Sequence, residues 1–213
     1  MVKERKVDWR GDRRQSARDA IVAAAWALVH DEGLAGMSLR DLARRAGITT
    51  PTVYAYFASK HAIYDAMFGQ AANAFAVAMA EPLESDDPYA VLLAHARRFV
   101  EFCTADVARY QLLFQHAIPE FEPSPASYAP AVRALATASE VLALNGLTDP
   151  RQLDMWTALL NGLVDQQISN DPGGDRWIKL IDEFVAMFCN YSLSERPKRT
   201  SQSGRSPTKG ARR

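Results

Sequence analysis

Cysteine and histidine are scarce in this sequence. Its 213 residues include two cysteines and four histidines, and none of them is spaced as a zinc site requires. Cys103 and Cys189 lie far apart in apolar, helix-patterned segments, where a free cysteine behaves as a small buried hydrophobe. We therefore expect two buried free thiols rather than a disulfide framework, and no bound metal.

Long apolar runs are also missing. The longest stretch without a charged residue, 66–80, has 15 residues and includes Gln70 and Asn73, whereas a membrane-spanning helix needs ~20 predominantly apolar residues. The first eight residues contain no apolar segment of the kind that a signal peptide has. We therefore expect no contact with a membrane and a cytoplasmic location.

Common sequence signatures of catalysis are absent too. The sequence contains no GxSxG, HExxH, GxGxxG or GxxxxGK[ST] motif. The histidines are scattered along the chain at His30, His61, His95 and His116. We predict a protein that is not an enzyme and that uses no cofactor.

The net charge is zero, but the charges are unevenly distributed. Residues 1–60 carry 11 Lys and Arg against 7 Asp and Glu, residues 61–192 carry 7 against 17, and residues 193–213 carry 7 against 1. Such asymmetry along a chain points to a nucleic-acid or membrane contact by its basic parts. The two basic ends are therefore the candidates for binding nucleic acid.

Helical periodicity dominates the sequence and strand alternation is missing, so we predict an all-α protein. The first helix is predicted at residues 13–32, with Gly33 at its end. Ser38, then Thr49 or Thr50, and then Ser59 are the predicted N-caps of three further helices. Five more helices are predicted at 88–103, 107–116, 129–145, 150–169 and 174–192. A proline-rich loop at 118–130 and a disordered basic tail from residue 193 complete the prediction.

Residues 38–57 have the pattern of a helix-turn-helix. Two short helices are joined by a turn at Gly47, and their shared apolar contact consists of Leu42, Ala46, Ile48 and Val53. In this motif the second helix enters the major groove by its N-terminal end, and the first crosses the backbone. Here that end carries threonines, whose hydroxyl groups can donate or accept a hydrogen bond and whose methyl groups can meet a thymine methyl.

Hydroxyl and amino groups beside the predicted second helix suit phosphate contacts. Tyr54 and Tyr56 lie outside the buried face that Val53 and Phe57 define, and such hydroxyl groups commonly donate to phosphate. Lys60 follows the Ser59 cap, where the free amides of a helix start already favour an anion. We predict that these residues flank a DNA-binding surface.

Residues 14 to about 67 resemble the TetR family of bacterial transcriptional regulators. The resemblance is carried by a long first helix, the segment SLRDLARRAGIT and the hallmark segment TVYAYFASKHAIYDAM. It implies an Ω-shaped homodimer with nine helices per subunit. By this resemblance the chain has a basic arm at 1–12, a DNA-binding domain at 13–67, a ligand-binding and dimerisation domain at 68–192, and the tail at 193–213.

The resemblance also assigns DNA contacts by position. Thr50, Pro51 and Thr52 would face bases beside Thr49, while Ser38, Tyr54, Tyr56 and Lys60 would contact phosphates. Residues 49–57 contain neither a cation nor a side-chain amide, so this helix cannot make bidentate contacts to guanine or adenine. We therefore expect base reading by threonines and DNA shape. The affinity would come from the cations Arg44, Arg45, Lys60, Lys3, Arg5, Lys6, Arg10, Arg13 and Arg14.

The C-terminal half suggests a dimer interface and a ligand pocket. The predicted interface consists of Leu153, Leu160, Leu163, Gln167, Trp177, Ile181, Phe184 and Phe188, although helix spacing fits the core of one subunit equally well. Ala158 and Gly162 would permit close helix approach. The predicted pocket consists of Phe99, Phe102, Cys103, Tyr110, Phe114, His116, Phe121 and Trp156, an aromatic stripe that is also typical of a packed core.

These patterns predict a homodimeric repressor that binds a palindromic double-stranded DNA operator and is released by a small, largely apolar effector. Two alternatives stay open. One is a DNA-binding regulator without a small-molecule ligand, and the other is a helical scaffold or adaptor with a degenerate helix-turn-helix.

Overall fold

The all-α prediction is confirmed by the computed structural model, which describes residues 9–194, with side chains from residue 11 onward. In this range the chain forms no strand. Its helices are α1 (Trp9–Gly36), α2 (Leu39–Arg45), α3 (Thr50–Tyr56), α4 (Lys60–Ala80), α5 (Pro88–Ala105), α6 (Val107–Phe114), α7 (Pro125–Leu144), α8 (Pro150–Asn170) and α9 (Ile181–Ser194), with a 3-10 helix η1 at Ile178–Leu180. The predicted arm cations Lys3, Arg5 and Lys6, the side chain of Arg10 and the tail from 195 lie outside the described residues.

The predicted caps of the first helices are confirmed. The side chains of Ser38, Thr49 and Ser59 accept hydrogen bonds from main-chain amides in the first turns of α2, α3 and α4. These bonds satisfy amides that a helix start leaves without partners. Gly33 and Gly47 both have positive φ angles, of 76° and 67°, and they interrupt α1 and end the α2 turn where the sequence places them.

Three predicted boundaries are wrong. The first helix begins at Trp9, four residues before the expected start. The second wrong boundary is that of α7, which begins at Pro125 inside the predicted loop, because proline is tolerated in the first turn and Ser124 caps the helix. Pro130 is buried within this helix. The third, α9, begins at Ile181 rather than at residue 174.

The segment between α8 and α9 does not form a regular α-helix. Two side chains, one from α8 and one just after it, accept hydrogen bonds from the main-chain amides of this segment. Gln167 accepts hydrogen bonds from the Trp177 amide at 2.9 Å and the Ile178 amide at 3.2 Å. The Asp171 carboxylate accepts from the Arg176 amide at 2.9 Å, and this bond lowers the pKa of Asp171. These bonds give the backbone an alternative to helical pairing.

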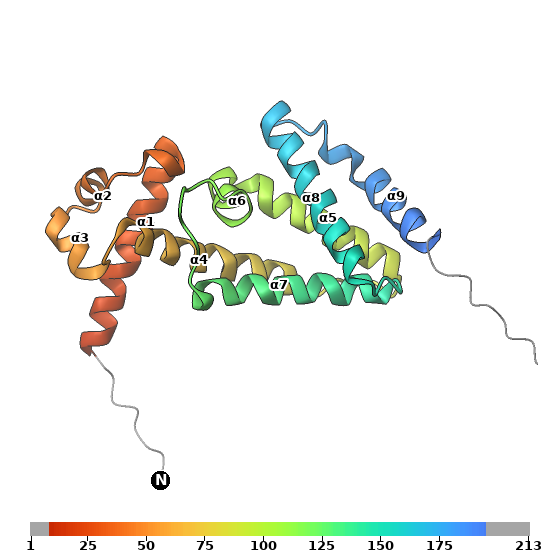
Figure 1. Cartoon of the computed structure of the whole chain (residues 1–213), viewed down its shortest axis with the longest axis horizontal. Helices are drawn as coiled ribbons and strands as arrows, with labels where there is room; N and C mark the ends of the chain where they lie inside the picture. The colour runs from red at the N-terminus through yellow and green to blue at the C-terminus, as the bar shows by residue number, and fades with distance from the viewer. Residues whose placement is uncertain (1–8, 195–213) are drawn as a thin grey trace, which may run out of the picture.

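The apolar side chains form two clusters, and α4 belongs to both. Its first half, including Ile63, Met67 and Phe68, packs with α1, α2 and α3. Its second half, including Phe75 and Met79, packs with α5, α6, α8 and α9. Figure 1 shows α4 running from the α1–α3 bundle at one end of the molecule along α7. A displacement of α4 would therefore disturb the packing of both hydrophobic clusters.

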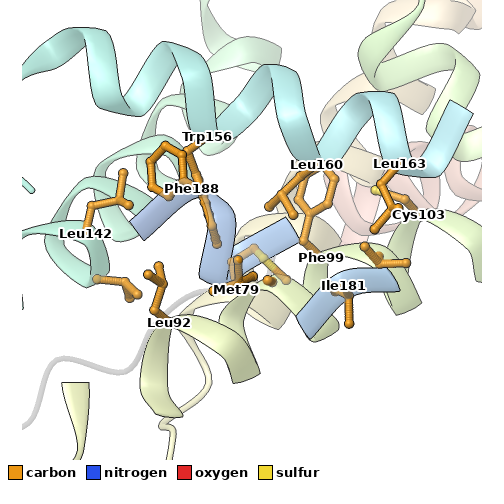
Figure 2. Close-up of a cluster of buried hydrophobic side chains, with 14 of the residues drawn as sticks. Met79, Leu92, Phe99, Cys103, Leu142, Trp156, Leu160, Leu163, Ile181 and Phe188 are labelled. Atoms are coloured by element: carbon orange, nitrogen blue, oxygen red, sulfur yellow. The ribbon is translucent and has the colours of Figure 1, made fainter. Parts of the chain in front are cut away.

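The second cluster is centred on the α5, α8 and α9 helices. Trp156 and Phe188 pack with ring centroids 5.1 Å apart, and Leu160 and Leu163 continue the row along α8 (Figure 2). The two cysteines are buried free thiols, as predicted, and burial raises the pKa of each. Within residues 9–194, no helix is both long and apolar enough to cross a membrane.

Candidate nucleic-acid interface

The predicted helix-turn-helix forms as two seven-residue helices joined at Gly47. Leu42 of α2 and Val53 of α3 are buried, and the turn is closed by a hydrogen bond from the Ile48 amide to the Ala43 carbonyl at 3.0 Å. Isolated helices this short are marginal in water, so α3 depends on contacts made by its neighbours.

Two arginines of α1 hold the C-terminal end of α3. Arg18 donates to the Tyr56 carbonyl at 2.5 Å and its guanidinium lies 4.1 Å from the centre of the Phe57 ring. Arg14 donates to the Ala55 carbonyl at 3.3 Å and lies 5.8 Å from the Tyr56 ring. Carbonyls at a helix end lack helical partners and carry partial negative charge, which these cations satisfy. The clamp leaves the opposite, N-terminal end of α3 free to meet a partner.

The N-terminal end of α3, which we call the α3 tip, consists of Thr50, Pro51 and Thr52. Pro51 is exposed and the two threonines are half-buried. The hydroxyl of Thr52 lies 2.8 Å from that of Thr49, and the Thr49 hydroxyl also accepts from the Thr52 amide at 3.3 Å. Thr50 has no such internal partner among the described residues, so its hydroxyl is the freest of the three for a base edge.

The remaining predicted phosphate-contacting residues differ in how free they are. Tyr54 is 52% exposed, whereas Tyr56 is half-buried beside Arg14. Ser38 is engaged locally, because its hydroxyl donates to the Asp41 carboxylate at 2.5 Å and accepts from the Asp41 amide at 3.1 Å. The Lys60 ammonium lies 5.4 Å from the centre of the Tyr64 ring.

The structure divides the predicted cations into paired and unpaired ones. Arg44 forms an ion pair with Asp41 at 2.8 Å, and Arg45 forms one with Asp31. Arg13 and Lys60 have no ion pair among the described residues, and Arg13 lines an open groove of about 720 Å³ with the α3 residues Pro51, Thr52, Ala55 and Tyr56. The phosphates of a DNA strand are negatively charged, so the cation in this groove would attract them.

Sequence reasoning missed Arg40. It is exposed on α2 and has no ion pair in the part of the chain that the structure describes. Its spacing of four residues from Arg44 puts both cations on one side of α2, which is the signal that could have found it. Arg40 therefore joins Arg13 and Lys60 as an unpaired cation of this end of the molecule.

The eight residues of the predicted ligand pocket are not brought together. Phe99, Phe102 and Phe114 pack around Phe75 with centroid distances of 5.2–5.7 Å, and Cys103, Tyr110 and Trp156 belong to the same cluster. Phe121 belongs to the other cluster. His116 and Phe121 instead line a separate cavity of about 550 Å³.

Five of the eight residues predicted for the dimer interface face the core of the subunit, and the other three are half-buried. Leu160, Leu163, Gln167, Ile181 and Phe188 are buried within the subunit, and Leu153, Trp177 and Phe184 pack partly against the same cluster. The exposed faces of α8, η1 and α9 carry other apolar residues, namely Met155, Leu180, Met187, Tyr191 and Leu193. Both faces of these helices are apolar, and periodicity cannot rank them.

Comparison with known proteins agrees with this arrangement. Residues 21–67 match the sequence pattern described as "Bacterial regulatory proteins, tetR family". The chain is 31% identical over 111 residues to the tetracycline repressor protein class C of Escherichia coli, an alignment covering 51% of this chain and 50% of the relative. It is 40% identical over 80 residues to the HTH-type transcriptional regulator EthR of Mycobacterium tuberculosis, covering 36% of each chain. The chain thus spans about half the length, or less, of these curated relatives.

A solved structure extends the similarity over both halves of the molecule. The multidrug binding protein EbrR, complexed with imidazole, superposes with a TM-score of 0.60 and 26% identity, covering 83% of this chain and 92% of that one. Fold and site together define a helix-turn-helix protein with a second, helical domain. The match to residues 21–67 makes this part of the chain similar to the tetR family of bacterial regulatory proteins.

Proposed function

We propose that the protein is a transcriptional repressor that binds a palindromic DNA operator as a homodimer and is released by a small, largely apolar effector. DNA binding would be the task of residues 13–67, and effector binding and dimerisation that of residues 68–192. The relatives named as repressor and regulator support the class of function.

One observation carries the DNA-binding part of the proposal. The guanidinium groups of Arg14 and Arg18 fix the C-terminal end of α3, so that the α3 tip faces outward beside the unpaired Arg13. In a helix-turn-helix the N-terminal residues of the second helix contact base edges. The unpaired cations Arg13, Arg40 and Lys60 would supply phosphate contacts, which dominate affinity and make it salt-dependent.

Titration of labelled DNA from upstream of the protein's own coding region tests this proposal. Fluorescence anisotropy over a series of salt concentrations gives both the affinity and its salt slope. We expect Lys60→Ala and Arg40→Ala each to weaken binding and to flatten the slope by ~0.9, the value for one lost phosphate contact. Arg151→Ala is the matched control, since Arg151 is an exposed arginine at the start of α8. Equal slopes for all four proteins would remove these cations from the interface.

The exposed apolar face of α8, η1 and α9 supports the homodimer. Met187 is 57% exposed and Tyr191 is 45% exposed on α9. On α8, Gly162 is exposed, and a Cβ added there would meet nothing within 4 Å. Glycine inside a helix is unfavourable relative to alanine unless another backbone approaches closely. A second copy packed against α8 would provide that approach and cover the neighbouring apolar side chains.

Two-fold symmetry then connects the dimer to its DNA site. A homodimer presents two copies of α3, and its operator is expected to repeat the same half-site in inverted orientation. An effector that binds one separation of the two α3 helices better than the other would shift the population between DNA-binding and released states.

A further inference from the structure

The helix α7 has an apolar face that the described part of the chain leaves uncovered. Its opposite face, including Ala134 and Val141, is buried in the second cluster. On the uncovered face, Tyr128, Val132 and Leu135 are between 45% and 53% exposed. Figure 1 shows α7 along the lower edge of the helical domain, with α8 and α9 towards the upper edge. This surface, which we call the α7 face, is therefore separate from the exposed apolar face of α8, η1 and α9.

The exposed residues of α7 follow the spacing of a helix that pairs with another helix. Small or apolar residues recur at alternating intervals of three and four, at the exposed positions Ala129, Val132, Ala136, Ser139 and Ala143. Such alternation places the side chains in one seam along the helix, which a second helix can cover. The distance between two packed helices depends on the side chains at their contact, and small ones let the helices approach closely. The seam therefore suits close packing against another helix.

Two opposite charges flank this seam at equivalent positions. Arg133 and Glu140 are both exposed, and because they lie seven residues apart they share one position of the heptad. Neither forms an ion pair within the described part of the chain. Arg133 donates to the Asn73 side chain of α4 at 3.5 Å, which leaves its charge uncompensated. Both charges are therefore available to a partner that covers the seam.

The order of these charges selects a second copy of the chain in antiparallel orientation. In an antiparallel pair of helices, the same flank of each helix faces the same flank of the other. Two-fold symmetry then places each Arg133 opposite the partner's Glu140, so these two positions make two ion pairs. A parallel copy would instead place Arg133 level with the partner's Arg133, which is repulsive. The midpoint of the two charges lies between Ala136 and Thr137, where the two-fold axis would pass.

We propose that the α7 face binds a second copy of the chain in antiparallel orientation, with the two-fold axis beside Ala136. Tyr128, Val132 and Leu135 supply the large apolar side chains that leave water in this contact. Most of the seam consists of alanine and serine, which bury little apolar area, so the contact is weaker than association through α8, η1 and α9 and forms at higher concentration. Joining two homodimers in this way gives a tetramer with four α3 tips. That consequence rests on the function proposed above, but the α7 contact itself does not.

A charge swap tests the pairing in the full chain without DNA. Sedimentation velocity from low micromolar to several hundred micromolar protein gives the dissociation constant of the tetramer. With Arg133→Glu, two attractive pairs become two repulsive ones, and we expect this constant to rise at least about tenfold. Glu140→Arg alone should have the same effect. Both substitutions together restore opposite charges and should return the constant to within about threefold of the parent. No rescue by the double variant would overturn the charge pairing.

Arg151→Glu is the matched control for the charge reversal, since Arg151 is an exposed arginine on α8. It should leave the dissociation constant of the tetramer unchanged. A loss of tetramer in Arg151→Glu equal to that in Arg133→Glu would assign the effect to net charge and contradict the α7 contact.

Single cysteines test the antiparallel geometry. Ala136→Cys places a thiol beside the two-fold axis, whereas the helix rise of 1.5 Å per residue puts the two copies of Ala143→Cys about 20 Å apart along the helix. That distance is far beyond the ~7 Å between Cα atoms that a disulfide can bridge. The native cysteines are buried. We expect oxidation, or a short bismaleimide, to cross-link Ala136→Cys to itself and not Ala143→Cys. Equal cross-linking of the two variants would overturn the antiparallel arrangement.

Leu135→Glu separates the two associations. This variant should remain a dimer at every concentration, with a native circular dichroism spectrum. A Leu135→Glu protein that still forms tetramers would overturn the proposal, as would a parent that stays dimeric at the highest concentration. A monomeric Leu135→Glu protein would assign the homodimer itself to the α7 face and refute the tetramer. A parent that forms the tetramer but protects no DNA would contradict the repressor function alone, and a dimer that binds DNA but never forms tetramers would contradict this inference alone.

Discussion

Acid sensitivity of the fold can be worked out from His95. This side chain is 2% exposed, and neither of its ring nitrogens has a hydrogen-bond partner in the described structure. Burial, together with nearby Arg98, lowers the pKa of His95 from its ordinary 6.5 to about 4. The folded protein therefore binds this proton more weakly than the unfolded chain does, and stability falls as the pH drops from 6.5 towards 4.

The size of this loss follows from the two pKa values. Linkage between protonation and folding gives a decrease in the free energy of unfolding of about 2 kcal/mol between pH 7 and pH 5, and about 3 kcal/mol by pH 4. His95→Leu removes both the titration and two buried, unpaired nitrogens. The variant should be more stable than the parent at pH 7 by about 1–3 kcal/mol, because each unpaired polar atom is costly to bury.

Urea unfolding followed by circular dichroism measures this effect at one fixed protein concentration. The advantage of His95→Leu over the parent should grow by about 2 kcal/mol when the pH falls from 7 to 5. His116→Asn, which changes an exposed histidine, should follow the parent at both pH values. If His95→Leu and the parent lost stability in parallel, the buried, neutral state of His95 would be refuted.

Two further predictions concern the α3 clamp and the dimer. Arg18→Met should lower the free energy of unfolding by about 2 kcal/mol, since a charge-assisted hydrogen bond and a ring contact are lost together; a urea midpoint equal to that of Arg151→Met would contradict the clamp. Gly162→Ala should favour the isolated α8 helix by about 1 kcal/mol yet weaken self-association. Met187→Glu should yield monomers in light scattering after gel filtration, whereas Leu144→Glu, at an equally exposed position, should leave the dimer intact.

Local signals in the sequence were sufficient to predict the helix-turn-helix. Ser38, Thr49 and Ser59 cap helices by bonds to amides three residues away, and Gly47 takes a backbone angle that few other residues adopt. Such features depend on near neighbours in the chain, so one sequence contains all the information that they need. Proline was ambiguous for the same reason. Pro125 starts α7, although a cluster of prolines also indicates a loop.

The site residues contributed by distant segments were harder to predict. The unpaired state of Arg40 depends on which carboxylates the fold brings near it, and Asp41 and Asp31 instead pair with Arg44 and Arg45. Helical spacing identified the apolar faces of α8 and α9 but could not say that Leu160 and Phe188 face inward. The cavity lined by His116 and Phe121 arises where α4, α6, α7 and the segment between α6 and α7 meet, an arrangement that periodicity within any one of them does not specify.

Footprinting with purified protein on the DNA upstream of its own coding region tests most directly whether the α3 tip reads duplex DNA in a symmetric pair. We predict protection of one near-palindromic site, with two chains per site by native mass spectrometry, and loss of protection in Lys60→Ala at a salt concentration where Arg151→Ala still protects. A folded protein that stays monomeric at micromolar concentration and protects no site would contradict the account and favour the scaffold alternative.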